Sequence, residues 1–97
     1  VNIINLKNKD NNCMDKCIEI HNDLEKNDID SIVDDRDESA GKKFSDSDLI
    51  GFPVTLVVGP RELENGNVEI RFRREGNNQI IPYDNVLKII KNKLFEE

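Results

Sequence analysis

The amino-acid sequence predicts a three-layer α/β/α fold, in which helices cover both faces of a mixed five-stranded sheet with one antiparallel strand. Two observations support this fold class. Apolar segments alternate with amphipathic helical patterns in the first half of the chain, which is typical of parallel strands joined by right-handed crossovers. Two later segments flank the turn residues 76–78 and indicate a hairpin that adds the antiparallel strand. Residues 1–97 are enough for a single domain.

The first half of the chain supplies most of the expected sheet. We expect, in chain order, a strand at 3–6, a helix at 12–26, a strand at 29–33, a helix at 44–50 and a strand at 54–58. Asn11 or Asn12 is the expected N-cap of the first helix, and Gly51 is expected to close the second. The strand at 54–58 is almost unbroken in its apolar character, which suits the centre of a sheet covered on both sides.

The second half ends the sheet and adds a closing helix. We expect a helical turn at 61–64, strands at 68–72 and 79–81, and a helix that follows Asp84 as its N-cap. Val68, Ile70 and Phe72 alternate with charged residues, which predicts a strand with one solvated face.

Charge and composition exclude several classes of protein. The net charge of −6 argues against generic nucleic-acid binding, for which a basic surface is usual. The charge is uneven, however, with −8 over residues 10–50 and +4 over residues 71–93, so a local anion site is compatible with the acidic average. No apolar run approaches the roughly 18 residues that a membrane helix needs. Because the chain begins at Val1 rather than Met, we expect it to be a piece of a longer protein.

The motifs of the common enzyme classes are missing. The chain has neither a Walker phosphate loop nor the GxGxxG pattern of dinucleotide sites, and no serine stands in a nucleophile elbow. His21 is the only histidine. We therefore expect no complete active site within this chain.

Cys13, Cys17 and His21 lie four residues apart and share one face of the first expected helix. Thiolates and imidazole are good zinc ligands, but the fourth ligand is lacking and the three span about 12 Å of helix axis. A disulfide between the cysteines is also poorly placed on one helix face. The favoured interpretation is that the cysteines serve as small apolar core residues.

Asp34 and Asp35 follow an expected parallel strand, where ligand sites of open α/β sheets often lie. One hypothesis is a magnesium-binding acidic pair, as in a receiver domain used in signalling. That hypothesis requires a further Asp at the end of the central strand, which instead ends in Val58-Gly59-Pro60. We therefore favour a structural role, in which Asp34 or Asp35 binds nearby backbone amides and Arg36 balances the charge.

Residues 41–48 place two lysines, an aromatic ring and two carboxylates on one short helix. An exposed Phe44 would stack on an unpaired base, and a carboxylate would accept hydrogen bonds from the donor edge of a guanine. The alternative is that Phe44 is an anchor of the core.

Several linked segments resemble one family, the anticodon-binding domains of class IIa aminoacyl-tRNA synthetases, and among these the prolyl-tRNA synthetases of bacterial type. The resemblance is carried by residues 34–44 (DDRDESAGKKF), 48–53 (DLIGFP), 57–61 (VVGPR), 66–70 (GNVEI) and 73–76 (RREG). It covers about residues 2–95 with the order and spacing of the family. It implies the same α/β/α fold with a mixed sheet.

The resemblance also implies recognition of the two guanines in the proline anticodon. The family positions that contact the anticodon correspond here to Phe44, Asp48, Thr55 and Arg61. Phe44 would stack, Asp48 would read a guanine's donor edge, and Arg61 would bind O6 or phosphate. Thr55 replaces a basic residue of some members. Candidate contacts to the RNA backbone are Arg36, Lys42 and Lys43.

The remaining implications concern a longer parent chain, of which this domain would be the C-terminal fragment. The parent would be a cytoplasmic homodimer whose catalytic domain attaches proline to tRNA with ATP and Mg²⁺, whereas this domain itself would need no cofactor and no metal. Threonyl, histidyl and glycyl synthetases carry related domains and are alternatives within the family. The receiver-like domain is the alternative outside it.

Overall fold

The computed structural model of the chain describes all residues except 7–9, 37, 74, 77 and 95–97. Its elements are β1 (Asn2–Asn5), α1 (Asn11–Lys26), β2 (Ile32–Asp34), α2 (Ala40–Ile50), β3 (Val54–Val58), α3 (Pro60–Glu64), β4 (Asn67–Phe72), β5 (Asn78–Pro82), the 3-10 turn η1 (Tyr83–Asn85) and α4 (Val86–Leu94). Asn77, in the expected hairpin turn, and Arg74, in the segment 73–76, lie outside the described residues.

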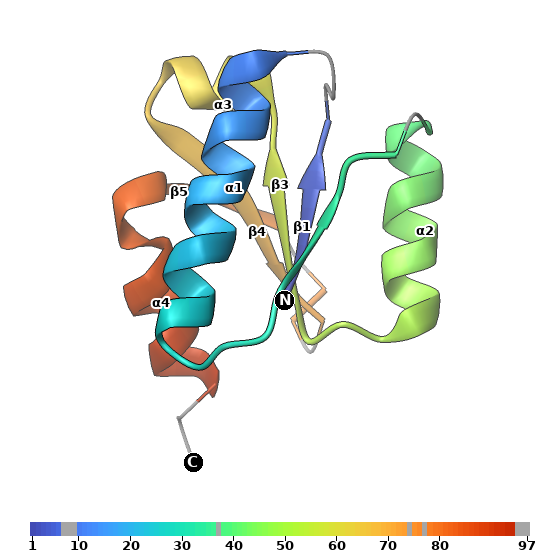
Figure 1. The fold of residues 1–97 in the computed structure, drawn as a ribbon. Coiled ribbons are helices and arrows are strands. Elements are labelled where there is room, and N and C mark those ends of the chain that lie inside the picture. The colour runs from blue at the N-terminus through green and yellow to red at the C-terminus, as the bar shows by residue number, and fades with distance from the viewer. Residues whose placement is uncertain (7–9, 37, 74, 77, 95–97) are drawn as a thin grey trace.

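The sheet has the strand order β2-β1-β3-β4-β5. Strands β2, β1 and β3 are parallel, and β4 is antiparallel to both β3 and β5. Helices α1, α3 and α4 lie on one side of the sheet and α2 lies on the other (Figure 1). The predicted mixed five-stranded sheet with one antiparallel strand, in three layers, is therefore confirmed.

The main core lies between the sheet and α1 and α4. Ile3, Leu56 and Ile70 project from three neighbouring strands and are fully buried. Cys13 and Cys17 face them from α1 as fully buried thiols that form no disulfide. The prediction that both cysteines act as small apolar core residues is confirmed. His21, one turn further, lies 2.6 Å from the Ser31 hydroxyl through its Nδ1.

Two predicted helix caps were wrong. Asp10 caps α1, since its Oδ1 accepts hydrogen bonds from the backbone N–H groups of Asn12 at 2.9 Å and Cys13 at 3.3 Å. This geometry makes Asn11 the first helical residue rather than a cap. Asp84 lies inside the 3-10 turn η1, so α4 begins only at Val86.

The second strand is shorter than the predicted 29–33. The backbone N–H of Ile29 donates to the Leu24 carbonyl at 2.9 Å. This hydrogen bond belongs to the end of α1, so Ile29 does not pair with a neighbouring strand. Asp28 follows with φ +61°, a left-handed conformation that turns the chain away from the helix axis. As a result β2 is a short edge strand that begins at Ile32.

Polar side chains attach α2 to the sheet. The Lys43 ammonium group is buried and donates to the Asn5 carbonyl at 2.8 Å, at the end of β1. One turn later the hydroxyl groups of Ser47 and Thr55 lie 2.8 Å apart, which joins α2 to β3. Gly51 ends the helix with φ +86°, as predicted, and its N–H donates to the Ser47 carbonyl.

An ion-pair cluster links α2 to the edge strand. Arg36 donates to both carboxylate oxygens of Asp34, at 2.8 and 2.9 Å, and its third nitrogen lies 3.0 Å from Asp46 on α2. Asp34 also accepts from the Arg36 backbone N–H at 3.3 Å. The predicted structural role of Asp34, balanced by Arg36, is thus confirmed.

We expect the thiols to be unreactive in the folded chain. Burial raises the pKa of Cys17 to about 12, and the neighbouring Cys13 adds to the shift. At pH 8 iodoacetamide should therefore modify Cys17 far more slowly in the native chain than in the chain unfolded by guanidinium, where a thiol pKa of about 8.5 applies. Mass spectrometry at timed intervals measures both rates, and comparable rates would contradict the buried position.

We expect the ion-pair cluster of Arg36, Asp34 and Asp46 (the Arg36 cluster) to make the stability of the fold depend on pH in the acidic range. Hydrogen bonds from Arg36 hold the pKa of Asp34 below its ordinary value, so the stabilisation is present above about pH 4 and is lost as the pH falls through the lower folded value. Arg36→Gln should lower the melting temperature at neutral pH, and this loss should shrink as the pH falls below about 4 and Asp34 becomes protonated. If Arg36→Gln lowers the melting temperature equally at neutral and acidic pH, the Arg36–Asp34 pair does not stabilise the fold through the charge of Asp34.

Candidate nucleic-acid interface

Helix α2 has one flank that faces β4. Phe44 and Asp48 are one helical turn apart and lie on this flank, beside the inward-facing Lys43 and Ser47. Phe44 is half-buried and Asp48 is exposed. The structure thus brings together the two side chains that the sequence assigned to base stacking and to reading a guanine.

Arg71 completes this flank from the neighbouring strand. Its Nη2 lies 3.3 Å from each carboxylate oxygen of Asp48, while its Nε is buried and has no hydrogen-bond partner among the described residues. No sequence pattern had pointed to Arg71 as a site residue. The sequence did place Arg71 on the solvated face of its strand. Its position opposite Thr55, and therefore beside α2, follows only from the register of the folded sheet.

Thr55 lies beneath α2 and not on the exposed flank. It is 6% exposed and its hydroxyl is hydrogen-bonded to Ser47. In this conformation Thr55 supports the helix that carries Phe44 and Asp48, and a direct contact to RNA would require α2 to move.

Arg61 is exposed on α3, just past the carboxyl end of β3. Among the described residues no hydrogen bond or ion pair joins its side chain to Phe44, Asp48 or Arg71. The structure therefore leaves Arg61 as a separate cation on the end of the domain where α2 begins.

The three candidate backbone contacts differ in exposure. Lys42 is exposed and lies 3.4 Å from Asp46, and Arg36 is held by Asp34 and Asp46. Lys43 is 2% exposed and its ammonium is bound to the Asn5 carbonyl, so in this conformation it is inside the fold and does not present its charge to a ligand.

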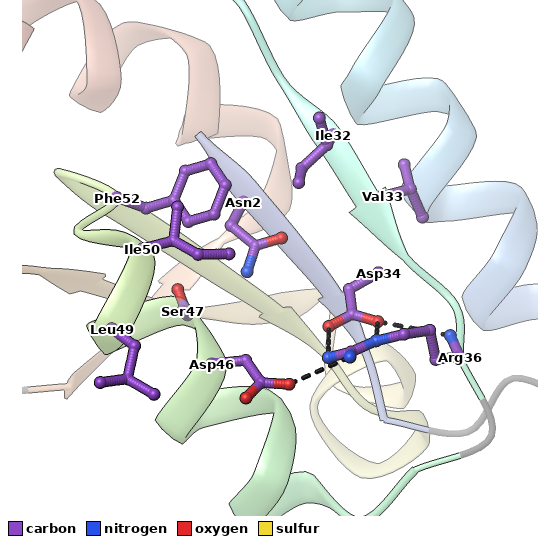
Figure 2. A pocket seen from close by; sticks show the side chains of 10 residues that line it. All are labelled: Asn2, Ile32, Val33, Asp34, Arg36, Asp46, Ser47, Leu49, Ile50 and Phe52. Atoms are coloured by element: carbon purple, nitrogen blue, oxygen red, sulfur yellow. Dashed lines mark hydrogen bonds and ion pairs between the residues drawn. The ribbon is translucent and has the colours of Figure 1, made fainter.

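The other flank of α2 faces β2 and encloses a pocket of about 400 Å³ (Figure 2). Its lining residues come from β1, β2, α2 and the segments that follow β2 and α2: Asn2, Ile32, Val33, Asp34, Arg36, Asp46, Ser47, Leu49, Ile50 and Phe52. One end of the pocket is polar and holds the Arg36 cluster, and the other end is apolar. The two flanks therefore differ in chemistry.

The described residues contain neither a cluster of metal ligands nor a membrane-spanning helix. In the part of the chain that the structure describes, no three His, Cys, Asp or Glu side chains are grouped so that they could hold a metal ion. Among the same residues, no helix has the length and hydrophobicity needed to cross a membrane.

Comparison with known proteins identifies the family. The family model described as "Anticodon binding domain" matches residues 1–93. The chain is 46% identical over 74 residues to the proline–tRNA ligase of Rhizobium meliloti, and this match covers 76% of this chain and 17% of that protein. It is 35% identical over 94 residues to the proline–tRNA ligase of Syntrophomonas wolfei, and this match covers 97% of this chain and 16% of that protein.

A solved structure has the same fold. The prolyl-tRNA synthetase from Cryptosporidium parvum, crystallised with L-proline and AMP, aligns with a TM-score of 0.88 and 25% identity over 98% of this chain and 20% of that one. The chain thus spans about a sixth of the length of the curated relatives described above. Since the family model covers nearly the whole sequence, the chain belongs to the anticodon-binding domain family.

Proposed function

We propose that this chain is the anticodon-binding domain of a prolyl-tRNA synthetase and that it reads the guanines of the proline anticodon. The observation that carries the proposal is the flank of α2, where a half-exposed ring, a carboxylate and a guanidinium group lie together. The curated relatives described above are proline–tRNA ligases, which favours the prolyl enzyme over the threonyl, histidyl and glycyl enzymes.

The chemistry of each side chain suits a guanine. The Asp48 carboxylate accepts hydrogen bonds from guanine N1–H and N2–H₂, which a neighbouring adenine or pyrimidine does not offer in the same arrangement. Phe44 offers a ring on which an unpaired base stacks. Arg61 supplies donors for O6 or a phosphate, and Lys42 supplies charge for the RNA backbone.

Arg71 gives the carboxylate its orientation. Both Asp48 oxygens lie 3.3 Å from the same Arg71 nitrogen, so the carboxylate is held beside β4 before any ligand arrives. The exposed pair adds only about 0–1 kcal/mol to stability, so its main effect is on geometry and local charge. It places a cation beside an acid that would otherwise repel phosphate.

The activity of the whole protein is part of the same proposal. The parent chain would supply the catalytic domain that activates proline with ATP and Mg²⁺, and it would work as a homodimer in the cytoplasm. This domain would bind the tRNA and lie beside the catalytic domain of the parent chain. Because its net charge is −6, we propose weak RNA binding with a marked dependence on salt.

Asp48→Ala tests the reading of guanine. We expect the variant to lose about 1–3 kcal/mol of discrimination between a proline anticodon stem-loop and one with both guanines replaced. Fluorescence anisotropy with the two labelled stem-loops at low salt measures this difference.

Asp46→Ala is the matched control, since it removes the same charge from the same helix on the opposite flank. We expect it to keep the discrimination between the two stem-loops. If Asp48→Ala changes the binding of both RNAs equally, Asp48 does not distinguish guanine from other bases and the proposed role is refuted.

Phe44→Leu separates stacking from packing. Leucine keeps most of the apolar contact of the half-buried ring but has no π face, so we expect a loss of about 1–3 kcal/mol in RNA binding with little change in melting temperature. Differential scanning fluorimetry and the same anisotropy assay measure the two effects. A large drop in melting temperature with unchanged RNA affinity would instead assign Phe44 to the core.

A further inference from the structure

The pocket on the opposite flank of α2 is not used by the proposed RNA surface. Its apolar end is formed by side chains that the fold leaves in solvent, since Ile32 is 51% exposed, Leu49 84% and Ile50 69%. Figure 2 shows these side chains and Phe52 on either side of Asn2. Half of the exposed large hydrophobic residues of the described chain thus gather at one concave site.

A buried polar atom lies in the wall of this pocket. Asn2 is 3% exposed, and its side-chain oxygen has no hydrogen-bond partner among the described residues. A buried acceptor without a partner costs free energy, which a ligand with an N–H donor would recover. The site therefore combines apolar walls with one acceptor, as small binding pockets commonly do.

The charge of the segment that contains β2 favours one class of partner over another. Asp34 lines the pocket and is paired with Arg36, the single base at 28–38. The other described acids of this segment flank β2 in the sequence, and they are Asp28, Asp30, Asp35 and Glu38. On α2, Lys42 and Asp46 balance one another. An RNA backbone would be repelled from this edge of the domain, whereas a polypeptide with Lys or Arg beside its anchor is complementary to it.

We propose that this pocket is a docking site for a basic protein segment that inserts a tryptophan side chain. The indole is the large apolar side chain that carries one N–H donor and no acceptor, which matches the Asn2 oxygen and the walls around it. The pocket volume of about 400 Å³ lies within the range of ligand pockets. The lysines or arginines of the segment would lie against the acids next to β2.

Three blocked tripeptides test the proposal by NMR titration of the isotope-labelled chain. The first is acetyl-Lys-Trp-Lys-amide, the second carries 1-methyltryptophan, which lacks the N–H, and the third replaces both lysines by glutamate. We expect the first to shift the amide signals of Ile32, Val33 and Ile50 selectively. The methylated peptide should bind about fivefold more weakly, and the acidic peptide should also bind more weakly.

Two variants locate the contacts. In Asn2→Leu the first two peptides should bind equally, because the acceptor that distinguishes them is gone. Leu49→Ser should weaken every peptide without loss of folding, since Leu49 is 84% exposed. The matched control is Ile18→Ser, which removes a 47% exposed apolar side chain from α1, outside the pocket, and should leave binding unchanged.

Three results would overturn the proposal. One is no selective shift at the pocket up to the solubility limit of the lysine peptide. Another is equal binding of the lysine, methylated and glutamate peptides to the unmodified chain. The third is a larger shift of these same signals with a single-stranded oligoribonucleotide, which would make the pocket part of an RNA surface.

Discussion

The buried Lys43 ammonium group sets the position of α2, and both candidate sites depend on that position. A charge removed from water is costly unless it is hydrogen-bonded, and Lys43 meets this requirement by donating to the carbonyl at the end of β1. The partner is a backbone atom of a central strand, so the contact fixes the helix relative to the sheet itself. The hydroxyl pair of Ser47 and Thr55 fixes the next turn in the same way.

This arrangement divides α2 into two flanks with different chemistry. The flank towards β4 carries Phe44 and the Asp48–Arg71 pair, where a cation from the strand offsets an acid from the helix. The flank towards β2 carries a largely apolar pocket beside an acidic segment. An acidic domain thus keeps local charge balance where we propose RNA contact and keeps its acidic excess at the other edge, which gives each flank a different class of partner.

Sequence periodicity predicted the order and type of the elements because each strand and helix has a clear apolar face. The alternation of Val68, Ile70 and Phe72 appears in the structure as a strand with those three residues buried. Local capping was harder to predict, since Asp10, Asn11 and Asn12 all have side chains able to cap a helix and only the backbone geometry selects Asp10.

The candidate site was predictable only in part. Phe44 and Asp48 could be predicted to lie together because they are one turn apart on the same helix. The contact between Arg71 and Asp48 could not be predicted, because it depends on the register of β4 in the sheet, and no local sequence pattern determines that register. The burial of Lys43 was equally hidden, because a lysine is normally assigned to the surface. The pocket around Asn2 also escaped prediction, since it is formed by segments distant in the sequence.

The most direct test of the account is an NMR titration of the chain at low salt with a proline anticodon stem-loop and with the same stem-loop lacking both guanines. The account predicts that only the guanine-containing RNA shifts the signals of Phe44, Asp48, Arg61 and Arg71, while the signals around Asn2 stay in place. Equal shifts with both RNAs would contradict the reading of guanine, and shifts confined to the flank towards β2 would contradict the assignment of the RNA surface.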